Sequence, residues 1–419
     1  MTTETTRRQK PAIRRPALSW PGAGLGRDVQ LLALAMFFWD FGIGVFNNLW
    51  AIYVESLGAS PKMIGLLVGG QSIIRVALTL PSGIVADHVS RRKLLIYSTL
   101  AGVPAAIIYG LATTWWHLIP GLFLMALTNF SLPALSSYIS DAVPSGDRAK
   151  AFSYIYTMSP AVAFIIAPTF GGWLVEATNF RMVFFVAAAS TTVTAFVFWQ
   201  LSDIAPHAHE GPKATYREAL AVPAIRAVTT LQLIIVGFLL SVATFLPVFL
   251  KSEYGVSIAQ IGWLGSIAAV GSILLTLLIS RVKGLSASRG IALGSVLFGA
   301  VCAVALSTGD LRVLGPAFLM RGSFMVTWSL FYALLGDVTP SRLRGRSFGL
   351  AEFMMGIGIG VFPFIAGWIY GQNENALLLL TVAVTPLLAI ATLFVERRFV
   401  KPASLSVARE QALEGLSTA

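Results

Sequence analysis

Charged side chains are scarce in this sequence. Only 12% of the 419 residues are Asp, Glu, Lys or Arg, whereas 56% are hydrophobic. A soluble domain carries about a quarter charged residues, because water must solvate most of its surface. The composition therefore excludes an ordinary water-soluble protein and indicates that much of the chain contacts lipid.

Cysteine and histidine are also rare. The single cysteine, Cys302, excludes an intrachain disulfide, and its apolar surroundings favour a small buried side chain. His207 and His209 lie close together, but a metal site needs further ligands, so we expect no metal and no cofactor. We find neither a phosphate-binding loop of the G-x-x-x-x-G-K type nor a convincing set of nucleophile, base and acid, which argues against an enzyme.

Long apolar runs dominate the sequence instead. Stretches of about 20 residues, each able to cross roughly 30 Å of hydrocarbon as a helix, recur between Gln30 and Val395. The period-two alternation of a membrane β-barrel is missing, for example from Leu231 to Leu250. We therefore predict an all-α membrane protein with 12 transmembrane helices. The predicted spans are 30–53, 62–86, 93–112, 116–140, 152–174, 181–201, 228–250, 258–281, 289–308, 312–336, 347–370 and 376–395.

Positive charges are distributed unevenly around these spans. With the N-terminus inside, 24 of the 30 Lys and Arg residues lie in the two tails or in loops on the same side. This positive-inside pattern predicts that both termini are cytoplasmic in a multi-pass protein of the inner membrane. Residues 1–27 lack a signal-peptide cleavage pattern, so we expect the first span to be retained. The net charge of +11 then predicts contact with anionic lipid head groups rather than with nucleic acid.

The chain repeats itself once. A pattern of Asp, Pro, Arg and Phe occurs twice, with every position displaced by 196 residues. Gly65 recurs as Gly262 and Pro168 as Pro363, displaced by 197 and 195 residues. Each half therefore holds six spans in the same orientation, which is typical of transporters that rock two bundles about a central site. The two copies of the pattern are Asp141, Pro144, Arg148, Phe152 and Asp337, Pro340, Arg344, Phe348.

The repeat and the spans divide the chain into five parts. A polar linker joins the two bundles, and its stretch from Tyr216 to Ile225 could form a helix on the membrane surface, limited in length by Pro223. The predicted parts are a cytoplasmic N-terminal tail (1–29), an N-terminal six-helix bundle (30–201), a cytoplasmic linker (202–227), a C-terminal six-helix bundle (228–397) and a cytoplasmic tail (398–419).

The segment after the second span resembles the signature of the major facilitator superfamily. Residues 83–92 read GIVADHVSRR, close to the pattern G-x-x-x-D-R/K-x-G-R-R/K, with His88 and Ser90 in place of a permanent cation and a glycine. The resemblance implies two six-helix bundles and a loop that latches the outward-facing state; the alternative is that these charges only set the topology. The latch candidates from this loop and from the repeated pattern are Gly83, Asp87, Arg91, Arg92, Asp141, Arg148, Asp337 and Arg344.

The fifth span carries a second family motif. Residues 167–172 read APTFGG, similar to the G-P-x-x-G-G motif of the drug/proton antiporters of this superfamily, with Ala167 in place of the first glycine. Proline bends a span and glycine lets helices approach closely, so Pro168, Gly171 and Gly172 predict a bending gate. The alternative is a kinked helix that only packs.

Four ionisable side chains lie inside predicted spans, where charges are costly and usually face the interior: Asp40, Arg75, Arg321 and Glu352. Asp40 and Arg75 fall at similar depths in adjacent spans, so we predict a buried pair that serves coupling, substrate binding or structure. Glu352 is a second candidate proton carrier, although it could reach the loop. Arg321 lies near the outer third of its span and could instead reach the outer interface.

Amides and aromatic residues at comparable depth could line a substrate cavity. Asn47 and Gln71 lie on the same helix faces as Asp40 and Arg75, although such amides often only join helices. The cavity candidates are Trp39, Asn47, Gln71, Asn129, Tyr154, Tyr156, Trp328 and Tyr332.

These features predict a secondary active transporter that works by alternating access. The leading hypothesis is proton-coupled efflux of amphipathic small molecules, as in multidrug resistance, with the proton gradient as energy source. The alternatives are a symporter or uniporter of a polar metabolite (a sugar or an organic anion) and a lipid-translocating transporter; a receptor or scaffold is another class. We expect a monomer whose partners are its small-molecule substrate and the lipid bilayer.

Overall fold

The computed structural model describes most of the chain, and every regular element within the described ranges is a helix. His207 and His209 fall outside these ranges. The described residues are 25–143, 147–203, 215–282 and 284–407. Within them, the side chains of residues 79–88, 131–133, 137, 140–141, 149 and 341 lie outside the description.

The N-terminal half consists of six helical rods, several of which are interrupted by a short break rather than a loop. α4 and α5, for example, together span residues 91–111. The elements of this half are α1 (Arg27–Asn47), α2 (Trp50–Ser56), α3 (Pro61–His88), α4 (Arg91–Leu100), α5 (Gly102–Leu111), η1 (Trp115–His117), α6 (Leu118–Leu127), η2 (Thr128–Phe130), α7 (Ser131–Ala142), α8 (Arg148–Ser153), η3 (Tyr154–Met158), α9 (Ser159–Ala177) and α10 (Phe180–Trp199).

The C-terminal half follows the same plan after a short linker helix. Only Gly322 separates α15 from α16. The elements are α11 (Tyr216–Ala221), α12 (Pro223–Tyr254), α13 (Ile258–Arg281), α14 (Ala287–Ser307), α15 (Leu311–Arg321), α16 (Ser323–Val338), η4 (Ser341–Leu343), α17 (Arg344–Tyr370), α18 (Glu374–Val395) and η5 (Glu396–Val400).

Local sequence signals fix many of these boundaries. α12 begins with Pro223, which needs no backbone donor in the first turn, and this ends the linker helix before it. α12 ends at Tyr254 and is capped by Gly255, whose φ of +63° lies in the left-handed region. α13 then begins with a capping box in which Ser257 and Gln260 each accept the other's backbone N–H.

The predicted membrane architecture is confirmed. Within the described residues, eleven helices are long and apolar enough to cross a membrane, and α3 adds a further helix of 28 residues. The predicted span 258–281 coincides with α13. Some spans differ from prediction. The first is broken at residues 48–49, the third at Ala101 and the tenth at Gly322. The last continues as helix to Val407, where Glu396, Val400 and Val407 are buried.

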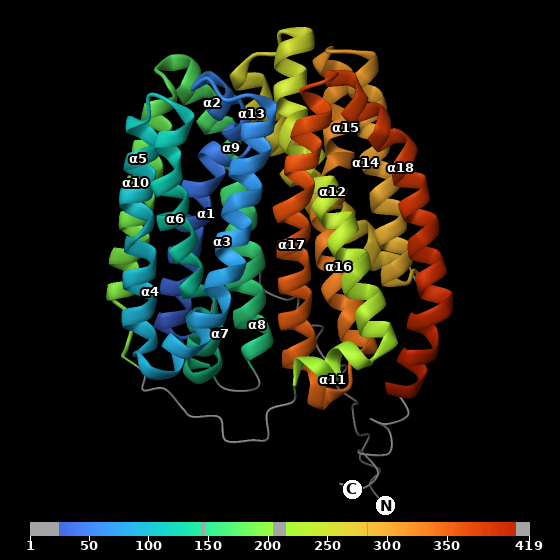
Figure 1. Ribbon diagram of the computed structural model, residues 1–419. Helices are drawn as coiled ribbons and strands as arrows, with labels where there is room; N and C mark the ends of the chain where they lie inside the picture. Colours follow the sequence, from blue (N-terminus) through green and yellow to red (C-terminus); the bar gives the residue numbers. More distant parts are fainter. Residues whose placement is uncertain (1–24, 144–146, 204–214, 283, 408–419) are drawn as a thin grey trace, which may run out of the picture.

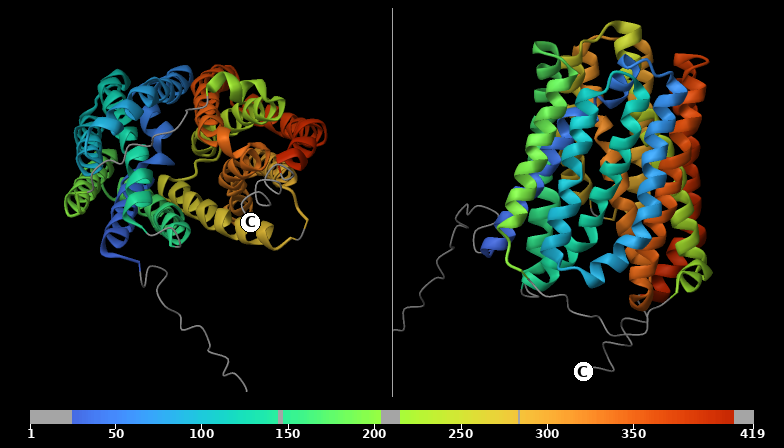
Figure 2. Two further views of the ribbon diagram at one scale, coloured as in Figure 1. Left: turned by 90° about the horizontal axis from the view of Figure 1, so that it is seen from below. Right: turned by 60° about the vertical axis from the view of Figure 1, so that its left-hand side comes forward.

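The two halves stand side by side, α1 to α10 in one and α12 to α18 in the other (Figures 1 and 2). α1 begins and α18 ends at the end of the molecule that carries α11, which we call the linker end. The opposite end, which carries α2, is the far end. This arrangement leaves an interface between the halves that runs along the direction of the helices.

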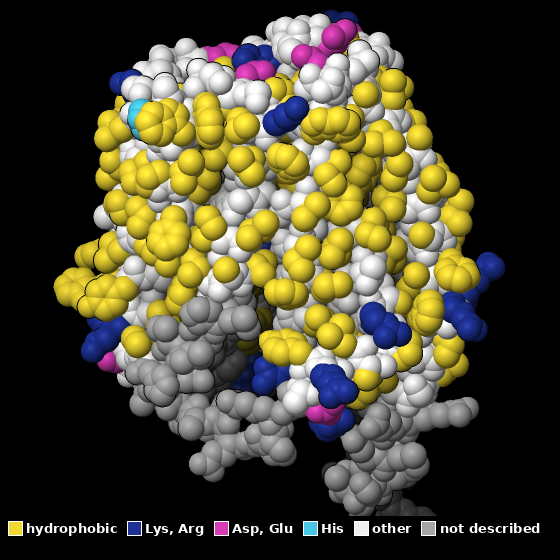
Figure 3. Space-filling model, viewed as in Figure 1, with side chains coloured by type: hydrophobic (Ala, Val, Ile, Leu, Met, Phe, Trp, Pro, Cys, Tyr) yellow, Lys and Arg dark blue, Asp and Glu magenta, His cyan; other side chains and the backbone are white. Residues whose placement is uncertain are grey.

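The outer surface is that of a membrane protein. Hydrophobic side chains cover the broad middle of the molecule in Figure 3, whereas Lys and Arg side chains gather toward its ends. Trp116, Trp173 and Trp199 are exposed on this surface. Large apolar side chains in such numbers on the outside require lipid rather than water around the helices.

Two helix crossings hold the halves together. α3 packs along α17, and α9 packs along α13. At both crossings a glycine meets a proline carbonyl: a Cβ on Gly65 would overlap the oxygen of Pro363, and one on Gly262 would overlap that of Pro168. The repeat seen in the sequence therefore brings equivalent glycines to equivalent contacts, and only glycine permits this approach.

Candidate functional site

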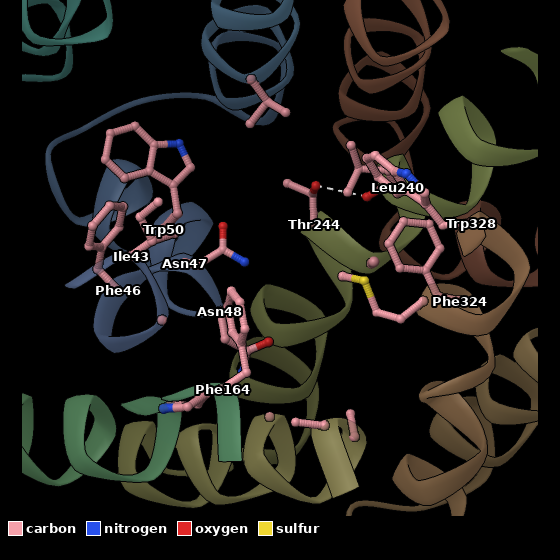
Figure 4. Close-up of a pocket in the computed structure, with 18 of the residues that line it drawn as sticks. Ile43, Phe46, Asn47, Asn48, Trp50, Phe164, Leu240, Thr244, Phe324 and Trp328 are labelled. Atoms are coloured by element: carbon pink, nitrogen blue, oxygen red, sulfur yellow. Dashed lines mark hydrogen bonds between the residues drawn. The ribbon is translucent and has the colours of Figure 1, made fainter. Parts of the chain in front are cut away.

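A cavity of about 580 Å³ lies between the two halves. Helices of both halves line it, among them α1, α3 and α9 on one side and α12, α13 and α16 on the other. This volume is in the range of small-molecule sites. In Figure 4, Asn47 and Trp50 stand on one wall and face Thr244, Phe324 and Trp328 on the other.

The cavity contains many of the predicted site residues. Asn129 is held in place by its own turn, since its Nδ2 donates to the Ala126 carbonyl at 3.1 Å. The predicted residues that line the cavity are Trp39, Asn47, Gln71, Arg75, Asn129, Pro168, Arg321 and Trp328.

Other predicted cavity residues do not line it. Tyr156 shares a hydrogen bond of 2.9 Å with Ser136 and stacks on Phe152. Tyr154 likewise belongs to the residues packed against the N-terminal core at the linker end. Tyr332 donates to Glu352. These residues were chosen by type and approximate depth, and depth alone does not specify which face of a helix meets the cavity.

The structure adds lining residues that sequence reasoning missed. Asn48 occupies the break between α1 and α2, where its Nδ2 donates to the Ile261 carbonyl of the other half at 2.9 Å. Trp50, Phe164, Thr244 and Phe324 complete the aromatic and polar walls. The one available signal was the pair of adjacent amides, residues 47–48, within an apolar run.

The predicted pair of Asp40 and Arg75 is not formed. Arg75 Nη1 instead lies 4.0 Å from Glu352 Oε2 of the other half. Asp40 does not line the cavity, and its Oδ2 is buried without a hydrogen-bond partner. The packing of α3 along α17 brings Glu352 rather than Asp40 to Arg75.

Glu352 is the centre of a small polar cluster at the α3–α17 crossing. The Tyr332 hydroxyl donates to its Oε1, and Arg75 faces its Oε2. One turn away, Ser72 Oγ donates to the Gly356 carbonyl at 3.1 Å. A carboxylate from one half therefore meets a cation from the other at the edge of the cavity.

Arg321 lines the cavity and does not reach the outer interface. The helix break at Gly322 explains why the Arg321 side chain points into the cavity, because Gly322 packs against Gly271 and Ser272 of α13. Its Nη2 donates to the Ala243 carbonyl at 3.4 Å, and its Nε is buried without a partner.

The predicted gate of the fifth span lies at the crossing of three helices. Pro168 lines the cavity, Gly171 packs on the backbone of Val45 in α1, and Gly172 meets Ile258 and Gly262 of α13. Closely approaching backbones of this kind can separate only as whole helices, which is consistent with a gate but also with tight packing.

The latch prediction is only partly covered. The side chains of Gly83, Asp87 and Asp141 lie outside the described residues. Arg92 donates to the Trp199 carbonyl, and Arg148 Nε donates to the Val143 carbonyl at 3.0 Å, both within the N-terminal half. Arg91 is buried, whereas Asp337 and Arg344 are exposed. The latch thus stays a prediction.

Among the residues whose side chains are described, several polar contacts between the halves lie toward the far end. Lys251 Nζ lies 3.3 Å from Glu55 Oε2, and Glu176 accepts from the Ala259 backbone N–H at 2.9 Å. Asn48 and the glycine contacts of α9 and α17 lie in the same region. These contacts join the two halves toward the far end.

Comparison with known proteins points to one family. The family model described as Major Facilitator Superfamily matches residues 32–249 and again 230–416. The inner membrane transport protein YajR of Escherichia coli is 22% identical over 362 residues, covering 84% of this chain and 78% of YajR. A Na(+), Li(+), K(+)/H(+) antiporter of Planococcus maritimus is 28% identical over 171 residues, covering 39% of this chain and 40% of the antiporter.

The fold has matches among solved structures. A bacterial homolog of the human lysosomal transporter Spinster, in an inward-facing and occupied conformation, superimposes with a TM-score of 0.67 at 18% identity. The match covers 93% of this chain and 96% of that protein. At this identity the likeness establishes the fold and nothing finer.

Proposed function

The chain belongs to the major facilitator superfamily, and on that premise we propose that it is a secondary active transporter that exports amphipathic small molecules in exchange for protons. The cavity between the halves carries this proposal, because helices of both bundles line it and its walls hold both aromatic and polar side chains. A protein that alternates access needs such a site at the interface of its two bundles.

The positions of the contacts support a cycle in which the far end opens and closes. The positive-inside pattern favours a cytoplasmic linker end, so the described conformation corresponds to an inward-facing state. In the opposite state the crossings at Gly65 and Gly262 would separate, and the linker end would close over the substrate.

Two carboxylates support coupling to protons. Glu352 pairs across the halves with Arg75, so a proton on Glu352 would remove the charge that attracts Arg75 and favour separation of α3 from α17. Asp40 offers a second site, since its buried Oδ2 has no partner in this conformation. A proton that binds either group changes the charge inside the bundle, where charge is most costly.

A sequence motif and the cavity lining support export as the direction of transport and an amphipathic molecule as the substrate. The APTFGG sequence of residues 167–172 resembles the motif of drug/proton antiporters, and a cation/proton antiporter is among the relatives. The aromatic walls suit apolar groups, and the amides of Asn47 and Asn129 suit a polar group on the same molecule. Proton-coupled efflux accounts for both features.

The test is reconstitution. Compounds that raise the melting temperature of the purified protein would be followed in proteoliposomes, with and without an imposed proton gradient. We expect accumulation that requires the gradient and collapses with a protonophore, against protein-free liposomes as control. Equal flux with and without the proton gradient would contradict proton coupling. Absence of flux for every stabilising compound would contradict transport.

A further inference from the structure

The cavity is unbalanced in charge. Among its described lining residues, the ionisable cations are Arg75 and Arg321, and none is an Asp or a Glu. Arg75 faces the Glu352 carboxylate at 4.0 Å and is therefore compensated. The positive charge that remains comes from Arg321.

Arg321 makes few interactions for a guanidinium group. It has five N–H donors, of which one hydrogen bond of 3.4 Å to the Ala243 carbonyl is recorded, while Nε is buried and unpartnered. No carboxylate lies within 4.0 Å of it in the described part of the chain. A charged side chain inside a membrane protein without an anion is costly, and a bound anion would relieve that cost.

Groups around Arg321 stabilise its positive charge without supplying a full negative charge. The guanidinium lies 5.6 Å from the centre of the Phe318 ring, within reach of a cation–π interaction. Arg321 also ends α15, where backbone carbonyls carry partial negative charge. Both features stabilise the positive charge and leave donors for a ligand.

The positive charge of Arg321 has no counterpart at the corresponding position of the N-terminal half. Met125 occupies the position that corresponds to Arg321 in the N-terminal half, and it also lines the cavity. The aromatic side chains Trp50, Phe324 and Trp328 stand on opposite walls of the same space (Figure 4). A ligand would thus meet apolar surface on both sides and a cation on the C-terminal side only.

We infer that the substrates of this transporter are aromatic or otherwise apolar organic acids, whose carboxylate binds Arg321 while the apolar body lies between Trp50 and Trp328. This inference rests on the proposed function and narrows its substrate class. Arginine suits the task because its planar donors can hold both oxygens of a carboxylate. Arg75 remains with Glu352 and serves the movement of α3 against α17.

The experiment is a binding comparison on the purified full-length protein. A panel of aromatic carboxylates would be measured by thermal shift and calorimetry, each beside its neutral amide and the corresponding amine. We expect the carboxylates to bind roughly tenfold or more tightly than their amides. Arg321→Gln should abolish that preference, and Arg321→Lys should restore part of it.

Two matched variants serve as controls. Met125→Gln introduces the same amide at the corresponding position of the other half and should leave the preference for carboxylates within roughly twofold of wild type. Arg312→Gln removes an equal charge from the exposed start of the same helix, outside the cavity lining, and should change carboxylate affinity by no more than about threefold. Each variant must keep the elution profile and melting behaviour of a folded protein.

The outcomes separate this inference from the function itself. Equal binding of acids and amides, absence of binding by all the carboxylates, or a preference that survives Arg321→Gln would overturn the inference. Proton-driven flux of neutral or cationic compounds would leave transport intact and also overturn it. Carboxylates that bind through Arg321 but never cross the liposome membrane would uphold the binding site and contradict the proposed transport.

Discussion

The two helix crossings that join the halves have the same kind of backbone contact but different side-chain contacts. At α9–α13 and at α3–α17, a glycine lies against the carbonyl of an equivalent proline. The first crossing carries hydroxyl contacts, with Thr169 Oγ1 donating to Ser266 Oγ at 2.7 Å. The second carries the ion pair of Arg75 and Glu352. Both crossings have the same close backbone approach, whereas the ion pair of Arg75 and Glu352 is particular to α3–α17 among the described residues.

The largest effect is expected from filling the shared glycine contacts. Gly65→Ala would force α3 away from α17, and Gly262→Ala would do the same at α9–α13, because the new Cβ overlaps a backbone oxygen that cannot move alone. We expect each variant to lose transport by on the order of tenfold or more, with increased cysteine labelling at the far end.

Gly70→Ala is the matched control for this change. Gly70 lies in the same helix as Gly65, but a Cβ there meets no atom within 4 Å, so its flux should stay within about twofold of wild type. If Gly65→Ala and Gly70→Ala transport equally well, the α3–α17 contact is not a gate. If only one of the two crossings is sensitive, their equivalence fails.

Neutralising Glu352 should distinguish the α3–α17 crossing, which carries the ion pair with Arg75, from the α9–α13 crossing. In Glu352→Gln the attraction for Arg75 no longer depends on a proton, so we expect uphill flux to fall by roughly tenfold while downhill exchange continues. The measurement is substrate accumulation with and without a proton gradient in the same liposomes. Retained gradient-driven accumulation would exclude Glu352 as the proton carrier.

Asp40→Asn should have a smaller effect on transport and none on binding. Asp40 does not line the cavity, but its buried Oδ2 lacks a partner, so an amide there would remove a chargeable group from the bundle. We expect uphill flux to fall about threefold with unchanged substrate affinity. A loss of affinity in calorimetry would instead assign Asp40 to substrate binding.

Removing the hydroxyl contact at the α9–α13 crossing should change little. Ser266→Ala deletes the acceptor of Thr169, a loss of about 1 kcal/mol for a neutral hydrogen bond, so flux should fall only a fewfold. The pH dependence of flux should keep its wild-type shape. Ser72→Ala, which removes a hydroxyl from the other crossing, is the control; a changed pH profile in Ser266→Ala would contradict the division between crossings.

The smallest effect concerns the linker helix, which is attached to the α17 side. Glu218 accepts from Thr215 and lies 2.6 Å from Arg342, and these contacts lower its pKa below the ordinary 4.5. Because the folded pKa is depressed, the stabilisation is present above 4.5 and is lost as pH falls through the folded value. We expect faster hydrogen exchange in α11 below that pH, and in Glu218→Gln at neutral pH. If hydrogen exchange in α11 is unchanged in both experiments, the Glu218–Arg342 contact does not hold α11 to the α17 side.

The sequence predicts how far along a span each candidate residue lies, but it does not predict which helix face meets the cavity. Asn47, Gln71 and Arg321 were selected because polar groups inside spans face protein, and all three line the cavity. Asp40 is predicted by the same reasoning, and Tyr332 as an aromatic residue at comparable depth, and neither lines the cavity. A depth follows from counting 1.5 Å per residue, but the rotation of each helix is set by its packing against neighbours.

The sequence by itself determined the spans, the repeat and the family, because each depends on local composition or on spacing along one chain. Twenty apolar residues must form a helix in lipid wherever they lie, so the membrane architecture needed no tertiary information. The tertiary structure alone decided that Arg75 meets Glu352 and that Arg321 faces the cavity. These contacts join segments hundreds of residues apart, and they depend on which glycines allow two backbones to touch.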